Sequence, residues 1–126
     1  MVSQEGIATC RLELEELAKA GERLAYGGLM DCLGVERSKD GARSLKEYLD
    51  PIYEEEMEAG RPDITLILHK AGSLFGQYHS GGARARSVKV DPNNQEQIEN
   101  YKAELRKVYQ EWGGHPKGDL KKWLDS

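Results

Sequence analysis

The amino-acid sequence predicts an α+β fold: a winged helix-turn-helix-like core with a β-hairpin wing and one or two additional C-terminal helices. Three observations lead to this prediction. Segments with apolar residues at helical spacing flank a short polar connection in the first half of the chain. A β-branched, apolar segment at residues 64–69 then favours a strand. Helical spacing returns from residue 95 onward. Two helices joined by a turn and followed by a hairpin form the outline of a winged helix-turn-helix.

The first half of the chain is predicted to contain three helical segments. Residues 7–20 and 26–33 each carry an apolar face and are each followed by a glycine that can end a helix. A third helical pattern covers residues 41–59 and contains Pro51. Because proline removes one backbone hydrogen bond and clashes with the preceding turn, we expect either a kink at Pro51 or two separate helices.

The middle of the chain is predicted to form the hairpin. Residues 64–69 would be its first strand and residues 74–78 its second, with turn-forming residues between them. The glycine-rich, basic segment 79–86 is expected to be an exposed loop, and residues 87–90 a further short strand.

The last part of the chain is predicted to add helices to this core. Residues 95–112 carry an apolar face, which includes the aromatic residues of this segment and is more typical of core than of a base-stacking platform. A short helix at residues 117–124 would dock beside it. We therefore expect one domain over residues 1–126, with a winged-helix-like core at 7–90 and packing helices at 95–126.

Composition narrows the class of protein. The chain has 126 residues and a formal net charge of −4. No run approaches the roughly 18 apolar residues of a membrane helix, and the start lacks the pattern of a signal peptide. Cys10 and Cys32 lie in helical patterns without metal-ligand spacing, so both are expected to be reduced. These features predict a cytoplasmic protein that does not contact membranes.

The charges are unevenly distributed along the chain. Residues 36–46 hold four bases and two acids, and residues 64–90 hold four bases and no acid. Residues 47–63, between them, hold seven acids and one base. A local basic patch, rather than the net charge, determines whether a surface can bind phosphates. The sequence therefore predicts two surfaces of opposite sign.

Three segments carry a resemblance to a known family. Residues 24–30 (LAYGGLM), 41–45 (GARSL) and 72–82 (GSLFGQYHSGG) resemble the C-terminal DNA-binding domain of the alkylguanine-DNA alkyltransferases and their catalytically inert alkyltransferase-like relatives. The resemblance implies that Tyr26 lies against a DNA phosphate and that Arg43 enters the base stack from the minor groove. From the residues alone, Tyr26 could equally anchor a helix end against the core, and Arg43 could be a solvated helix residue or pair with Glu47.

Catalysis is not expected. The transferases of this family need a Pro-Cys-His-Arg strand, whereas the corresponding residues 61–66 read Arg-Pro-Asp-Ile-Thr-Leu. Both cysteines lie earlier in the chain and cannot replace the missing nucleophile. The histidines lack zinc-site spacing, and no phosphate-binding Gly-Lys-Ser/Thr motif follows the glycines. We expect no enzymatic activity, no metal and no cofactor.

The resulting hypothesis is non-catalytic binding of DNA by the third helix and the wing. The residues expected to contact nucleic acid are Tyr26, Arg37, Lys39, Arg43, Lys46, Lys70, Tyr78, His79, Arg84, Arg86 and Lys89.

An alternative hypothesis uses the acidic run instead. The protein could be a small phage or bacterial regulator or inhibitor whose acidic helix face binds a basic partner protein. Its interaction residues would be Glu54, Glu55, Glu56 and Glu58. A solvated helix face is the other interpretation of this run, which also departs from the family pattern.

Overall fold

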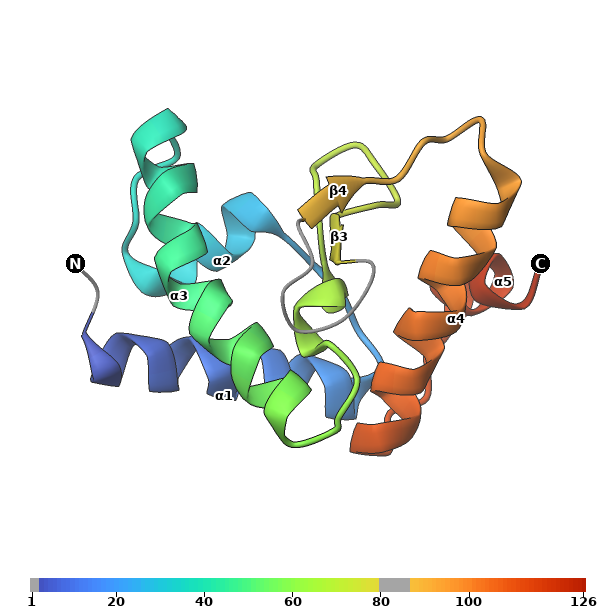
Figure 1. Ribbon diagram of the computed structural model, residues 1–126, viewed down its shortest axis with the longest axis horizontal. Coiled ribbons are helices and arrows are strands. Elements are labelled where there is room, and N and C mark those ends of the chain that lie inside the picture. The colour runs from blue at the N-terminus through green and yellow to red at the C-terminus, as the bar shows by residue number, and fades with distance from the viewer. Residues whose placement is uncertain (1–2, 80–86) are drawn as a thin grey trace.

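The structure is a computed structural model that describes residues 3–79 and 87–126, and it shows α+β architecture made mainly of helices (Figure 1). In chain order the elements are α1 (Gln4–Ala20), β1 (Leu24–Ala25), α2 (Tyr26–Leu33), α3 (Lys39–Glu58), the 3₁₀ helix η1 (Ile64–Ile67), β2 (Leu68–His69), β3 (Gln77–His79), β4 (Ser87–Lys89), α4 (Gln95–Trp112) and α5 (Gly118–Asp125). The predicted helices in the first half and at the C-terminal end are thereby confirmed: α2 and α4 have the predicted bounds, and the ends of the others differ by at most three residues.

The short helix η1 lies at the centre of the fold. It contacts α1, α3 and α4, and all four of its residues are buried. In Figure 1, α1 runs along the lower side with α3 crossing it, while α4 and α5 form the opposite end of the long axis. The apolar faces of these helices therefore meet around η1, and this arrangement leaves the first turns of α3 on the outside.

The predicted strand at residues 64–69 is wrong over most of its length. Residues 64–67 form η1, and only Leu68 and His69 are extended. The Asp63 carboxylate accepts hydrogen bonds from the Thr65 backbone N–H (3.0 Å) and hydroxyl (2.6 Å), which starts the 3₁₀ turn. An apolar run that is buried on all sides suits a short helix as well as a strand, so its composition does not distinguish them.

The hairpin is also displaced from its predicted position. The strand β2 pairs in parallel with β1, Leu24 opposite Leu68, instead of with residues 74–78. The antiparallel pair is β3 with β4, in which Tyr78 is opposite Val88. The hairpin therefore uses the strand expected at 87–90, and the segment that connects its two strands lies outside the described residues.

Helix α3 is one continuous helix through Pro51, so the alternative of two helices is wrong. The Ser38 hydroxyl caps its start by accepting a hydrogen bond from the Gly41 N–H (3.0 Å). Gly41 also allows a close approach, because a Cβ there would lie 1.7 Å from the Glu36 carbonyl oxygen. The tight turn between α2 and α3 therefore requires glycine at this position.

Arg23 joins several elements, although no sequence pattern identifies it. Its guanidinium donates hydrogen bonds to the carbonyl oxygens of Leu66 (3.0 Å), Ile67 (3.1 Å), Leu68 (3.3 Å) and Leu74. It also donates to the Tyr101 hydroxyl (2.6 Å), which in turn donates to the Leu66 carbonyl (3.1 Å). One side chain thus connects η1, β2 and the following turn to α4.

The two cysteines lie in different environments, which gives a testable difference in reactivity. Cys10 is fully buried, and this burial raises the pKa of its thiol to about 12. Cys32 is exposed, and both cysteines are free. Because the thiolate is the reactive form, we expect Ellman's reagent at pH 8 to react rapidly with one thiol per native chain and with two in denaturant. Cys32→Ser should abolish the rapid phase, and its persistence would contradict the buried placement of Cys10.

Candidate nucleic-acid interface

The first turns of α3 present three cations on one face. Lys39, Arg43 and Lys46 are spaced by four and three residues, which places them on one side of a helix, and all three are exposed. We call these three residues the cationic stripe. The buried residues of α3 occupy another face and are Gly41, Leu45, Ile52, Tyr53 and Glu56. The core thus fixes the orientation of α3 with the cationic stripe toward solvent.

Most of the charge on the stripe is not neutralised by neighbours. The Arg43 side chain is 85% exposed, and its Nη1 lies 4.0 Å from Asp40 Oδ1, at the outer limit of an ion pair. This ion pair is with Asp40 rather than with Glu47. In the part of the chain that the structure describes, neither Lys39 nor Lys46 forms an ion pair. The stripe can therefore offer positive charge to a phosphate backbone.

Arg37, which is predicted to contact nucleic acid, is exposed and forms an ion pair with Asp31. Its Nη2 lies 2.5 Å from Asp31 Oδ2 and its Nε 3.1 Å from Asp31 Oδ1. These hydrogen bonds lower the pKa of the Asp31 carboxyl group. A Cβ on Gly27 would lie 3.0 Å from the Arg37 Cζ, so the guanidinium also covers the start of α2. Arg37 is therefore a neutralised residue that connects α2 to the turn before α3.

Tyr26 is the first residue of α2 and lines a cavity beside the stripe. The cavity has a volume of about 150 Å³ and lies between α2, α3 and η1. Tyr53 and Lys46 also line it, together with apolar residues of both helices. A Cβ on Gly76 would lie 2.6 Å from the Tyr26 hydroxyl oxygen. Tyr26 thus lies at the edge of the core, half-buried, next to a residue of the stripe.

The remaining predicted contacts lie in or near the hairpin. Lys70 is exposed at the turn after β2, where its N–H donates to the Phe75 carbonyl oxygen (3.0 Å). The backbone places Tyr78 and His79 in β3 and Lys89 in β4. Arg84 and Arg86 lie outside the described residues. In Figure 1 the first turns of α3 and the β3–β4 hairpin both lie on the upper side of the molecule.

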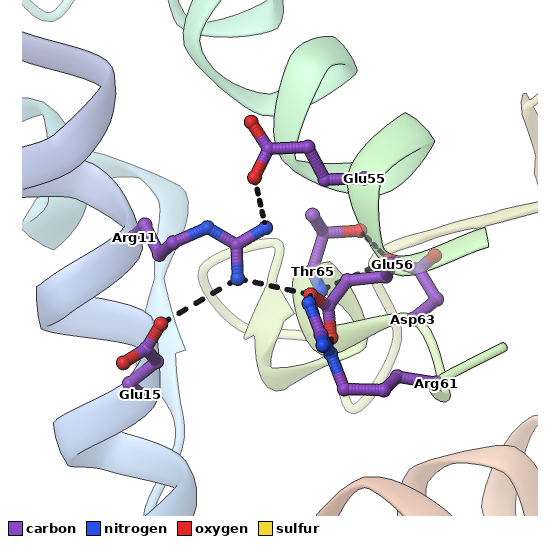
Figure 2. Close-up of polar contacts among 7 residues, drawn as sticks. All are labelled: Arg11, Glu15, Glu55, Glu56, Arg61, Asp63 and Thr65. Carbon is purple, nitrogen blue, oxygen red and sulfur yellow. Dashed lines mark hydrogen bonds and ion pairs between the residues drawn. The ribbon is translucent and has the colours of Figure 1, made fainter. Parts of the chain in front are cut away.

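The acidic run at the end of α3 is partly internal (Figure 2). Glu56 is fully buried and accepts hydrogen bonds from Arg11 Nη1 (2.9 Å) and Arg61 Nη2 (2.8 Å). Arg11 Nη2 also pairs with Glu55 (2.8 Å). The expectation that Glu56 belongs to a protein-interaction surface is therefore wrong, because helical spacing directs it to the core with Ile52. Glu54 and Glu58 are exposed.

Comparisons with known proteins supply no family assignment. No protein-family model matches the chain, and no curated protein and no solved structure is significantly similar to it. Among the residues that the structure describes, no group of three histidine, cysteine or acidic side chains could hold a metal ion. Within the same residues, no helix combines the length and apolar character needed to cross a membrane.

Proposed function

We propose that the protein binds DNA without catalysing a reaction, and that the first turns of α3 and the β3–β4 hairpin act together as a winged helix-turn-helix-like unit. The observation that carries this proposal is the exposed cationic stripe on a helix whose other face is fixed by the core. The resemblance of residues 24–30, 41–45 and 72–82 to the alkyltransferase-like DNA-binding domain supports DNA binding by α3. The family approaches the minor groove, whereas the major-groove approach proposed for this chain rests on the dimensions of α3 alone.

The dimensions of α3 suit this role. The stripe extends over about two turns, or about 11 Å of helix, and a helix can enter a major groove about 12 Å wide. The positive end of the helix dipole adds to the attraction for phosphates at the first turn. Beyond Lys46 the same face carries Asp50 and Glu54, which would repel phosphates. Only the beginning of α3 is therefore suited to approach DNA.

The decisive experiment is a fluorescence anisotropy titration of a labelled duplex of about 20 base pairs at several salt concentrations. We expect binding at low salt that weakens steeply as salt is added, because cations on the protein displace counterions from the duplex. The triple variant Lys39→Ala, Arg43→Ala, Lys46→Ala should bind about tenfold or more weakly. Its salt dependence should also be shallower, since each lost phosphate contact lowers the slope by about 0.9.

A matched control uses cations outside the proposed interface. Lys117 and Lys122 are exposed at α5 and form no ion pair within the described residues, so Lys117→Ala with Lys122→Ala should preserve both affinity and slope. Arg37→Ala should have a smaller effect than Arg43→Ala because Asp31 already neutralises Arg37. No binding by the unaltered protein at low salt, or equal binding by the triple variant, would refute the proposal.

A further inference from the structure

Another cavity lies at the opposite end of the molecule from the cationic stripe. It has a volume of about 260 Å³ and is formed by the end of α4, the connection after it, and α5. Figure 1 shows these elements on the right, whereas the first turns of α3 lie on the left. Arg106, His115 and Lys121 are among its lining residues, and Asp125 is the acid that lines it. With histidine neutral, the formal charge of the lining is positive.

We propose that this cavity binds the phosphate group of a sugar phosphate. The proposal is independent of the DNA-binding surface, because none of the cavity residues belongs to it. Arg106 and Lys121 supply the charge for a phosphate, and an arginine fork can bind two of its oxygens at once. Tyr109, Pro116 and Leu124 provide an apolar wall for the sugar. The Asp125 carboxylate can accept a hydrogen bond from a sugar hydroxyl.

Arg106 is held in position while keeping donors for a ligand. Its Nη1 donates a hydrogen bond to the Leu124 carbonyl oxygen, which joins α4 to α5. Within the described residues, its Nε and Nη2 have no hydrogen-bond partner, and Lys121 forms no ion pair. Asp125 lines the same cavity but is not within ion-pair distance of either cation. The charges are therefore present without being neutralised by one another.

The connection that forms one wall is rigidly packed. A Cβ on Gly114 would lie 1.9 Å from the Ala18 carbonyl oxygen, so the chain passes directly against the end of α1. The Tyr109 hydroxyl donates to the Glu22 carbonyl oxygen (2.8 Å), and Gly114 N–H donates to the Tyr109 carbonyl oxygen (2.9 Å). These contacts hold His115 and Pro116 against α1. The cavity is thus already formed before a ligand enters, which reduces the entropy lost on binding.

Isothermal titration calorimetry with ribose 5-phosphate tests the proposal. We expect a dissociation constant of about 1 mM or tighter, with weaker binding of inorganic phosphate and no binding of ribose. Lys121→Gln should weaken binding about tenfold, since a charge-assisted contact is lost. Lys122→Gln is the matched control, because Lys122 is exposed on the same helix but does not line the cavity, and it should bind normally.

Arg106→Gln provides a second variant, with its helical content checked by circular dichroism, and it should weaken binding at least as much as Lys121→Gln.

The sugar phosphate could be free or the end of a nucleic acid. A 5′-phosphorylated oligonucleotide that displaces ribose 5-phosphate would identify a nucleic-acid end as the ligand. This displacement should not occur with the unphosphorylated oligonucleotide, and it should be lost in Lys121→Gln. If the phosphorylated oligonucleotide does not displace ribose 5-phosphate, the ligand is the free compound. Absence of ribose 5-phosphate binding at millimolar concentration, or equal binding by Lys121→Gln and the unaltered protein, would overturn the proposal.

Discussion

Replacing Arg23 with alanine is expected to lower the free energy of unfolding by about 4 kcal/mol, more than any other single substitution that we propose. The guanidinium donates to four backbone carbonyls and to the Tyr101 hydroxyl. Three of these carbonyls belong to the buried residues Leu66, Ile67 and Leu68. An acceptor left buried without a donor costs about 1–3 kcal/mol, although water that enters the vacated space recovers part of this loss. Urea unfolding followed by far-ultraviolet circular dichroism measures the effect.

Arg23→Lys separates the role of the planar guanidinium group, with its several donors, from that of the positive charge. Lysine keeps the charge but presents its donors from one atom, so it cannot reach all of these carbonyls together. We expect it to recover less than about half of the lost stability. Lys19→Ala is the control, because the Lys19 side chain is 51% exposed at the end of α1 and its change should cost about 0.5 kcal/mol or less. A loss below about 1 kcal/mol in Arg23→Ala would contradict the assigned role.

Glu56→Gln is expected to cost about 3 kcal/mol. The carboxylate is completely buried between Arg11 and Arg61, whose side chains are 18% and 35% exposed (Figure 2). Glutamine has nearly the same shape but no charge, and its amide group would present donors to a guanidinium. Arg61 would then lose the charge of its partner in a partly buried site, which is costly because breaking a buried pair leaves a desolvated ion. Arg11 would lose one of three acidic partners, since it also pairs with Glu15 and Glu55. The same urea unfolding measurement applies.

The matched control for Glu56 lies two residues away on the same helix. Glu54→Gln removes an identical charge from an exposed position and should change stability by about 0.5 kcal/mol or less. Replacing all three members of the cluster together, Arg11→Met, Glu56→Leu and Arg61→Leu, should recover most of the loss, since a well-packed apolar substitute often equals a buried ion pair. Equal effects of Glu56→Gln and Glu54→Gln would show that burial of Glu56 has no energetic consequence.

Much of the helical architecture follows from the sequence because helical periodicity persists over many residues. The last residue of α4 is predicted correctly, since its apolar stripe ends at Trp112 before two glycines. Residues 64–67 are predicted as the wrong element because burial on all sides removes any alternation between polar and apolar positions. The short parallel pair of β1 and β2 has two residues per strand, which is too short to leave a pattern.

The candidate site can be predicted only as a set of residue types. The exposed positions of Arg43 and Lys46 agree with their place on the predicted helix 41–59, whereas Lys39 precedes that predicted helix and lies in the first turn of α3. Sequence spacing does not show that Asp31 neutralises Arg37. The burial of Glu56, in contrast, has a signal in the sequence. Glu56 follows Ile52 by four residues, so helical geometry directs it to the apolar face. A buried carboxylate at such a position needs a partner cation, which can be sought among the arginines of the chain.

In the proposed complex with DNA, the reversal of charge along α3 would limit how much of a duplex this helix can contact. Only about 11 Å of the helix is compatible with phosphates, and base pairs are about 3.4 Å apart, so the helix covers about three base pairs. In that complex the acidic residues that follow would repel phosphates and keep the rest of α3 out of the groove. Such a short site recurs throughout any long DNA. Occupancy by a single chain would therefore follow the amount of accessible DNA more closely than the presence of one particular sequence.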